Sequence, residues 1–209
     1  MKKSSRKTVN PGRRKQPTAV SGSVPGNSVF LVGFMGAGKS SVGRALGQRL
    51  NWLFEDLDDR IEAREGRKVA EIFADSGESE FRRAEHAALQ QVLHELRGGG
   101  ARIVALGGGT FAQEQNHKAI QASGIRTVFL DAPLDELWRR CAEQSDAKRP
   151  LMTSQNKFRE AHRARLPYYQ KASLRIDTIG KQVEAIAAEI MQTLKLKEIA
   201  LRTEQGEVE

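Results

Sequence analysis

Short apolar runs alternate along the chain with longer segments in which hydrophobic and polar residues follow a helical period. The apolar runs lie at residues 29–32, 53–54, 103–106, 127–130 and 174–176. Short runs without polar alternation are typical of strands that are buried on both faces of a parallel sheet. Between them, hydrophobic residues spaced three or four apart predict helices at residues 40–50, 61–64, 69–73, 80–97, 133–141, 156–166 and 183–194.

This alternation predicts an α/β fold, with a five-stranded parallel sheet between two layers of helices in a three-layer α/β/α arrangement. Gly77 is expected to follow the end of the helix at 69–73, and Pro167 to follow the end of the helix at 156–166. Residues 143–156 are polar and show no period, which indicates an exposed loop. A single domain is expected at residues 28–195, with tails at residues 1–27 and 196–209.

The formal net charge of +8 comes almost entirely from the N-terminal tail. Residues 1–28 contain seven Lys or Arg and no acidic residue, whereas the rest of the chain has 27 basic and 26 acidic residues. The tail is too polar to bury a core, so we expect it to be disordered, and it lacks the apolar stretch of a secretory signal. Because the remainder is nearly neutral, its charge gives no reason to expect the domain to bind nucleic acid.

Three further expectations follow from composition. No run approaches the roughly 18 apolar residues that a membrane helix needs, so no membrane association is expected. The single cysteine, Cys141, excludes an internal disulfide and suits a reducing cytoplasm. No exposed apolar stripe requires a partner, so we expect a monomer.

A glycine-rich turn follows the first predicted strand and precedes a predicted helix. Residues 33–40 match the pattern G-x-x-x-x-G-K-[ST] in full. The glycines let successive backbone N–H groups converge on phosphate oxygens, and the following helix adds the positive end of its dipole. Lys39 supplies a charge for the β- and γ-phosphates, and the Ser40 hydroxyl can bind Mg²⁺. The expected ATP contacts in this segment are Gly36, Ala37, Gly38, Lys39, Ser40 and Ser41.

Two aspartates follow the second predicted strand with one residue between them. If both Asp56 and Asp58 continue the strand, their carboxylates point to the same side, above the carboxyl ends of the sheet. One could hold Mg²⁺ through water, and the other could accept the proton of a substrate hydroxyl. The alternative is an acidic cap for the helix that begins near Ile61.

Three arginines are candidates for binding an acidic substrate or phosphate. Arg82 lies three residues before Glu85, which can orient its guanidinium group. Arg165 lies at the end of a predicted helix, and a guanidinium group pairs with a carboxylate in bidentate fashion. Arg149 lies in the polar loop and could close over the phosphates. For each of them, the alternative is a solvated surface arginine.

Together these segments resemble the shikimate kinase family over roughly residues 28–190. The resemblance is carried by residues 33–40, 54–58, 71–73, 77–78, 81–85, 106–109 and 149–151, and by Arg165 two residues before Pro167. It implies a P-loop kinase fold with a mobile lid loop. It also implies transfer of the γ-phosphoryl group of ATP to the 3-hydroxyl group of shikimate, with Mg²⁺, in aromatic amino acid biosynthesis.

The resemblance also implies roles for individual residues. Arg82 and Arg165 would bind the shikimate carboxylate, while Asp58 and the backbone of Gly108 would meet the ring hydroxyls. Ser40 and Asp56 would hold Mg²⁺. The catalytic residues would be Lys39, Asp58 and Arg149, and the nucleotide would also contact Arg140 and Arg149.

Two other functions fit part of the pattern. A related small-molecule kinase, such as a gluconate kinase, would keep the phosphate-binding loop but is not expected to combine Arg82, Glu85 and Arg165. An ATP-binding regulatory protein would use the basic tail to bind nucleic acid. The sequence departs from the family at Gly180 and Lys181, where many members have an Arg/Asn/Pro-rich loop that contacts adenine.

Overall fold

A five-stranded parallel sheet forms the centre of the molecule. The computed structural model describes residues 27–143 and 154–199, so Arg149 and nearly all of the basic tail lie outside the described residues. The strand order is β2-β3-β1-β4-β5, with all pairs parallel. The predicted fold class is therefore confirmed. The strands are β1 (Ser28–Val32), β2 (Leu53–Asp56), β3 (Arg102–Ala105), β4 (Arg126–Asp131) and β5 (Leu174–Asp177).

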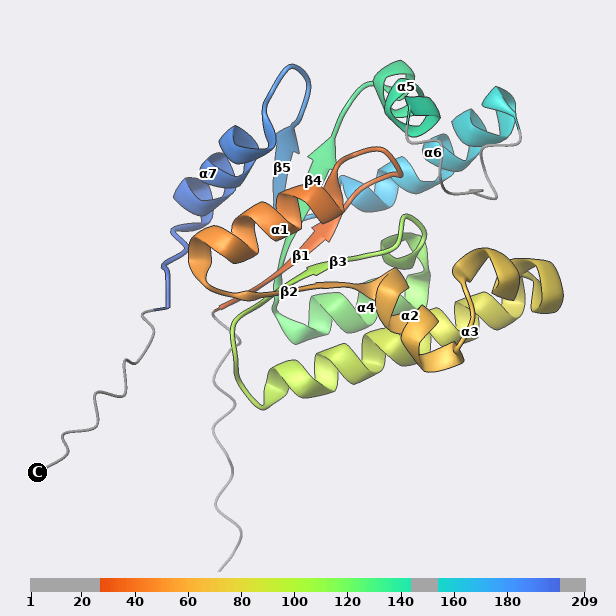
Figure 1. Cartoon of the computed structure of the whole chain (residues 1–209), viewed down its shortest axis with the longest axis horizontal. Helices are drawn as coiled ribbons and strands as arrows, with labels where there is room; N and C mark the ends of the chain where they lie inside the picture. The colour runs from red at the N-terminus through yellow and green to blue at the C-terminus, as the bar shows by residue number, and fades with distance from the viewer. Residues whose placement is uncertain (1–26, 144–153, 200–209) are drawn as a thin grey trace, which may run out of the picture.

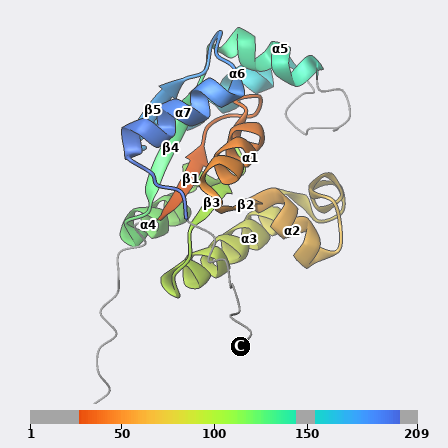
Figure 2. The ribbon, with the colours of Figure 1, turned by 60° about the vertical axis from the view of Figure 1, so that its left-hand side comes forward.

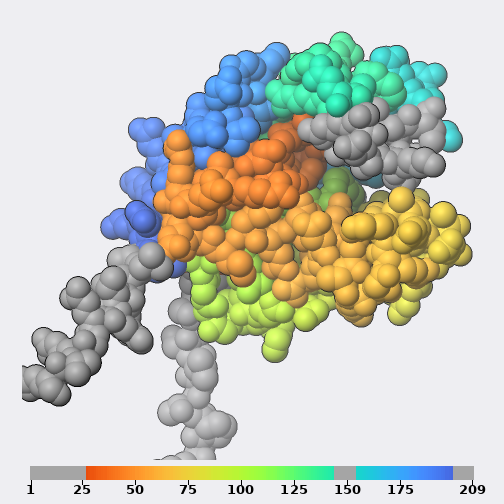
Figure 3. Space-filling model, viewed as in Figure 1, coloured from red at the N-terminus to blue at the C-terminus, as the bar shows by residue number. Residues whose placement is uncertain are grey.

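Helices cover both faces of the sheet, with α1 and α7 on one face and α3 and α4 on the other (Figures 1 and 2). In the space-filling view, α2 and the first part of α3 project from one end of the molecule (Figure 3). No helix in the two described stretches is long and apolar enough to cross a membrane. The helices are α1 (Lys39–Leu50), α2 (Leu57–Glu65), α3 (Val69–Arg97), α4 (Glu114–Ser123), α5 (Leu134–Glu143), α6 (Gln155–Tyr169) and α7 (Val183–Leu194), with a 3₁₀ turn, η1 (Thr110–Ala112).

Three segments differ from the sequence-based expectation. Two predicted helices form the single element α3, which is broken inside at Gly77 by a non-helical backbone (φ 78°, ψ 176°). Pro167 does not end its helix but lies inside α6, which continues to Tyr169. Helix α4 was not predicted, because two of its three buried residues, Asn116 and His117, are polar and leave no apolar stripe.

Close packing of α1 on β2 sets the geometry of the phosphate-binding end. Gly43 of α1 faces the Phe54 ring so closely that a Cβ atom at this position would overlap it. The absence of a side chain therefore lets the helix approach the strand. As a result, the first turn of α1, with Ser40, lies beside Asp56 at the carboxyl end of β2.

Candidate active site

The phosphate-binding loop joins β1 to α1, as the motif predicts. Gly36 and Gly38 adopt positive φ angles of 80° and 87°, and a Cβ atom on Gly36 would lie 2.6 Å from the Leu137 carbonyl oxygen of α5. The Lys39 ammonium group folds back over the loop, where it donates to the carbonyl oxygens of Gly33 (2.9 Å) and Phe34 (3.1 Å). The lysine thus lies above the curl of backbone that would cradle a phosphate.

The acidic pair lies directly beside this loop. Ser40 Oγ donates to Asp56 Oδ2 at 2.6 Å, and Asp56 Oδ1 accepts from the backbone N–H of Asp58 at 3.1 Å. The strand ends at Asp56, so the expected strand alternation is wrong, and Asp58 lies in the first turn of α2. Asp56 therefore caps α2, which was the alternative prediction for the acidic pair. It also faces Ser40, the residue whose hydroxyl is expected to bind Mg²⁺.

Asp58 is the most perturbed carboxyl group at this edge of the sheet. Burial, together with the negative charges of Asp56 and Glu85, raises its pKa from 3.8 to about 7. Its Oδ1 atom is buried and has no hydrogen-bond partner among the described residues. The same atom would lie 2.8 Å from a Cβ atom on Gly107, so glycine leaves room for it. A carboxyl group in this state is suited to exchange a proton with a bound hydroxyl.

Arg82 lies on the other side of the triple-glycine loop at residues 107–109. Its Nη1 donates to Glu85 Oε2 (2.8 Å), and its Nη2 donates to Glu78 Oε1 (3.0 Å). Glu85 is fully buried, whereas the side chain of Glu78 is 67% exposed. A Cβ atom on Gly109 would lie 2.5 Å from Arg82 Nη1, so this guanidinium group packs directly against the loop. The predicted pairing of Arg82 with Glu85 is confirmed.

Arg165 reaches the same loop from α6. A Cβ atom on Gly108 would lie 3.6 Å from Arg165 Nη1, and the guanidinium carbon lies 5.4 Å from the centre of the Phe34 ring. The buried Tyr169 hydroxyl donates to the carbonyl oxygen of Gly108, and burial raises the pKa of this tyrosine. The four expected acceptor residues, Asp58, Arg82, Gly108 and Arg165, therefore converge from three helices and one loop.

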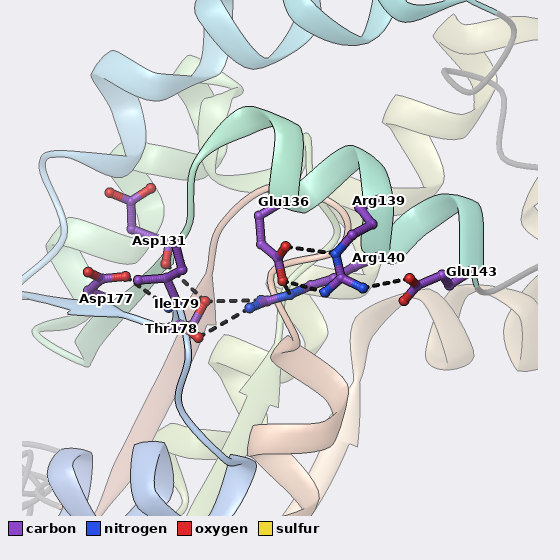
Figure 4. Close-up of polar contacts among 8 residues, drawn as sticks. All are labelled: Asp131, Glu136, Arg139, Arg140, Glu143, Asp177, Thr178 and Ile179. Atoms are coloured by element: carbon purple, nitrogen blue, oxygen red, sulfur yellow. Dashed lines mark hydrogen bonds and ion pairs between the residues drawn. The ribbon is translucent and has the colours of Figure 1, made fainter.

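Arg140 of α5 lies beside the loop that follows β5 (Figure 4). Its Nε donates to Glu136 (2.7 Å) and its two terminal nitrogens donate to the side chain (3.1 Å) and carbonyl oxygen (3.2 Å) of Thr178. Arg139 also bonds Glu136, and the two guanidinium groups hold the pKa of Glu136 at about 2. Arg140 is thus next to the loop at Gly180, where the sequence departs from the family pattern.

Two buried hydroxyl groups at this site were not among the predicted residues. Thr110 donates to Glu85 and Tyr169 donates to Gly108. A signal for Tyr169 was present, because it lies four residues after Arg165 and so on the same helix face. Thr110 directly follows the triple glycine, but its contact with Glu85 joins residues 25 apart in the sequence and depends on the fold.

The geometry agrees with similarity to known proteins. A family model described as shikimate kinase matches residues 35–195. The chain is 36% identical to the shikimate kinase of Persephonella marina over 169 residues, covering 80% of this chain and 99% of that one. It is 41% identical to that of Geobacter sulfurreducens over 173 residues, covering 80% and 92%.

Comparison with solved structures distinguishes members of the same family from proteins that share only the fold. A shikimate kinase from Acinetobacter baumannii, in complex with shikimate, superposes with a TM-score of 0.73 at 31% identity, covering 81% of this chain and 93% of that one. A gluconokinase from Sinorhizobium meliloti superposes with a TM-score of 0.54 at 17% identity, covering 82% and 93%, and so shares the fold alone. With the family match and these relatives, the chain belongs to the shikimate kinase family.

Proposed function

We propose that this protein transfers the γ-phosphoryl group of ATP to the 3-hydroxyl group of shikimate through the site described above. The observation that carries the proposal is the convergence of Arg82, Arg165 and the half-buried Asp58 on the triple-glycine loop, beside the phosphate-binding loop. This arrangement offers two cations for one carboxylate and one carboxyl group for an adjacent hydroxyl, which matches a small hydroxylated acid.

The two arginines bind the shikimate carboxylate. Each guanidinium group presents several N–H donors in a plane and can pair with both oxygens of a carboxylate. Arg82 approaches from α3 and Arg165 from α6, so the carboxylate lies between the two helices. Gly108 has no side chain beside Arg165, so the substrate can approach its backbone closely.

Asp58 orients the 3-hydroxyl group and takes its proton. The hydroxyl oxygen forms a bond to the γ-phosphorus while the bond from that phosphorus to the departing ADP oxygen breaks, and the hydroxyl proton passes to the Asp58 carboxylate. Burial raises the Asp58 pKa to about 7, which brings its proton affinity close to the range in which a general base is effective at neutral pH.

The nucleotide is bound by the loop and by side chains that change partners. Lys39 exchanges the carbonyl oxygens of Gly33 and Phe34 for phosphate oxygens, where its charge stabilises the transferring group. The backbone of Gly36, Ala37 and Gly38, and the first turn of α1 through Ser41, supply N–H donors. Arg140 lies on the adenine side, and Arg149, outside the described residues, completes the charge around the phosphates.

The residues beside the loop fit Mg²⁺. Ser40 Oγ and Asp56 Oδ2 lie 2.6 Å apart and provide a hydroxyl and a carboxylate oxygen, the donor types that Mg²⁺ prefers. The described residues contain no group of three or more His, Cys, Asp or Glu able to hold a metal by themselves. This suits an ion that binds through few protein oxygens together with phosphate and water. When bound, Mg²⁺ neutralises charge on the phosphates.

ADP release with Mg-ATP and a panel of acceptors tests this function. We expect turnover with shikimate and none above background with gluconate, other hydroxy acids or no acceptor. Turnover with gluconate instead would keep the kinase chemistry and reject the acceptor assignment. Acceptor-independent ATP binding without turnover would favour a regulatory role.

We further propose that the protein acts as a cytoplasmic monomer and that its domain does not bind nucleic acid. The single cysteine and the nearly neutral charge outside the tail support this. In the described ranges only three large hydrophobic side chains are exposed: Leu53, Ile179 and Ile199. Light scattering of the full chain is expected to give the mass of one copy, and a dimer mass would reject the monomer.

A further inference from the structure

The Glu85 carboxylate at the acceptor site has two donors from different parts of the fold. Its Oε2 accepts from Arg82 at 2.8 Å, and its Oε1 accepts from the Thr110 hydroxyl at 2.6 Å. Both Glu85 and Thr110 are 0% exposed. A buried carboxylate is costly unless each oxygen is hydrogen-bonded, so both donors are needed to keep this carboxylate in place.

Thr110 joins α3 to the triple-glycine loop. It is the first residue of η1, and its backbone N–H donates to the Gly107 carbonyl oxygen at 3.0 Å. A Cβ atom on Gly107 would lie 2.9 Å from Thr110 Oγ1 and 3.2 Å from Glu85 Oε1. The threonine hydroxyl therefore fixes Glu85 at a set distance from the loop against which the substrate is expected to bind.

Arg82 has a second partner that leads away from this position. Glu78 lies one helical turn earlier in α3, is largely exposed and accepts from two nitrogens of Arg82. If Glu85 rotates, Arg82 retains an ion pair with Glu78 and can turn toward solvent. Both acids hold the guanidinium group in the structure, so the bond between Thr110 and Glu85 secures the partner that keeps Arg82 against the triple-glycine loop.

We propose that Thr110 is a positioning residue for shikimate: its hydroxyl holds Glu85, which in turn holds Arg82 against the triple-glycine loop. The inference rests on the proposed role of Arg82 in binding the substrate carboxylate. It makes Thr110 important for recognition of that carboxylate and of no other part of the substrate. Thr110→Val removes the hydroxyl with little change of shape, whereas Thr110→Ser keeps the hydroxyl.

The test is calorimetric binding of shikimate and of its methyl ester, which lacks the charged carboxylate, to the full-length protein. We expect Thr110→Val to weaken shikimate binding about 10-fold, the loss typical of a hydrogen bond to a charged group, and ester binding less than about twofold. Thr110→Ser should lie within about threefold of wild type for both ligands, because its hydroxyl preserves that bond. Thr110→Ala, which also lacks the hydroxyl, serves if the valine variant does not fold.

Thr127→Val is the matched control. Thr127 is another buried threonine, in β4, and its hydroxyl accepts from the backbone N–H of Ser173 at 3.0 Å. It should lower stability without changing the preference for shikimate over its ester. Equal weakening of both ligands by Thr110→Val and Thr110→Ala, or no weakening, would overturn the positioning role. If Arg82→Ala leaves shikimate affinity unchanged, the proposed carboxylate site itself fails, and this inference fails with it.

Discussion

The proposed acceptor half and the proposed nucleotide half of the active site are held together in different ways. On the acceptor side, Glu85 and Thr110 are buried and bonded to each other, and Glu85 fixes Arg82. On the nucleotide side, Lys39 bonds to carbonyl oxygens of its own loop, and Arg140 bonds to Glu136 of the same helix and to Thr178 after β5. With the proposed roles, the acceptor half is preorganised by interactions that can persist in the complex, whereas Lys39 and Arg140 would exchange partners on binding.

This difference has an energetic consequence. A preorganised side chain loses little entropy on binding, so its removal should be costly and specific to one substrate. A side chain that leaves an existing ion pair contributes only the difference between its two sets of partners. Substitutions on the acceptor side are thus expected to have larger effects than those at Arg140.

The largest effect is expected for Asp58→Asn. Asparagine can still hydrogen-bond the hydroxyl group but cannot take its proton, so kcat should fall by about 10²- to 10⁴-fold, while KM for ATP stays within about twofold. Steady-state ADP release measures both constants. The control is Asp59→Asn, because Asp59 is the exposed neighbour on α2. A kcat for Asp58→Asn within a few-fold of wild type would remove the general base from the mechanism.

A smaller effect, confined to the acid, is expected for Arg82→Lys. Lysine keeps the charge but cannot pair with two carboxylate oxygens in a plane, so KM for shikimate should rise by about 10- to 100-fold. KM for ATP should not change, because Arg82 belongs to the acceptor half. Arg83→Lys is the matched control, since Arg83 is exposed and bonds only Glu80 among the described residues. An equal rise of both KM values would contradict a preorganised acceptor half.

The same contrast appears in what could be predicted from the sequence. The strands, the phosphate-binding loop and the pairing of Arg82 with Glu85 follow from local spacing, and each is confirmed. The orientation of Asp58 was predicted from strand alternation, which fails because Asp56 ends the strand and caps α2. The position is still correct, since both residues lie at the carboxyl edge of the sheet.

The unpredicted parts depend on contacts between distant segments. Helix α4 has polar residues buried in the fold, because Asn116 bonds His86 of α3. Thr110 and Tyr169 bond residues 25 and 61 positions away. A hydrophobic period carries no information about such polar pairs, so the buried hydrogen bonds that organise the acceptor half are visible only in the structure.

On the nucleotide side, Arg140 is proposed to contact the adenine ring, so Arg140→Ala should raise KM for ATP by about 3- to 10-fold, the range of a guanidinium contact with an aromatic ring. KM for shikimate should remain at the wild-type value. Arg139→Ala provides the control, because Arg139 shares the partner Glu136 but is 56% exposed and has Glu143, not Thr178, as its other partner (Figure 4). An effect of Arg139→Ala as large as that of Arg140→Ala would show that loss of the helix ion pairs, and not of a nucleotide contact, is responsible.

The smallest expected effect is a loss of stability that leaves substrate binding unchanged. Glu95 of α3 accepts from Arg60 of α2 at 2.8 Å and from Arg102 of β3 at 2.7 Å, and none of these three residues is part of the proposed acceptor site. Glu95→Gln should lower the free energy of unfolding by about 1 kcal/mol at pH 7, a modest value because the side chain is 32% exposed. Both KM values should be unchanged.

The pH dependence of this loss has a definite sign. The two arginines lower the pKa of Glu95 from 4.5 to about 2, so the carboxylate stabilises the folded protein above pH 4.5 and loses this effect as the pH falls toward 2. Urea unfolding of both proteins at pH 7, 5 and 3.5 should therefore show a difference that is constant at the first two values and smaller at the third. Glu114→Gln, in an exposed pair with Lys118, is the control and should show no resolvable change. A difference in the free energy of unfolding that grows toward acid would mean that Glu95 is not stabilised as a carboxylate. A raised KM for shikimate in Glu95→Gln would mean that the acceptor half depends on the ion pairs among α2, α3 and β3 as well as on its own hydrogen bonds.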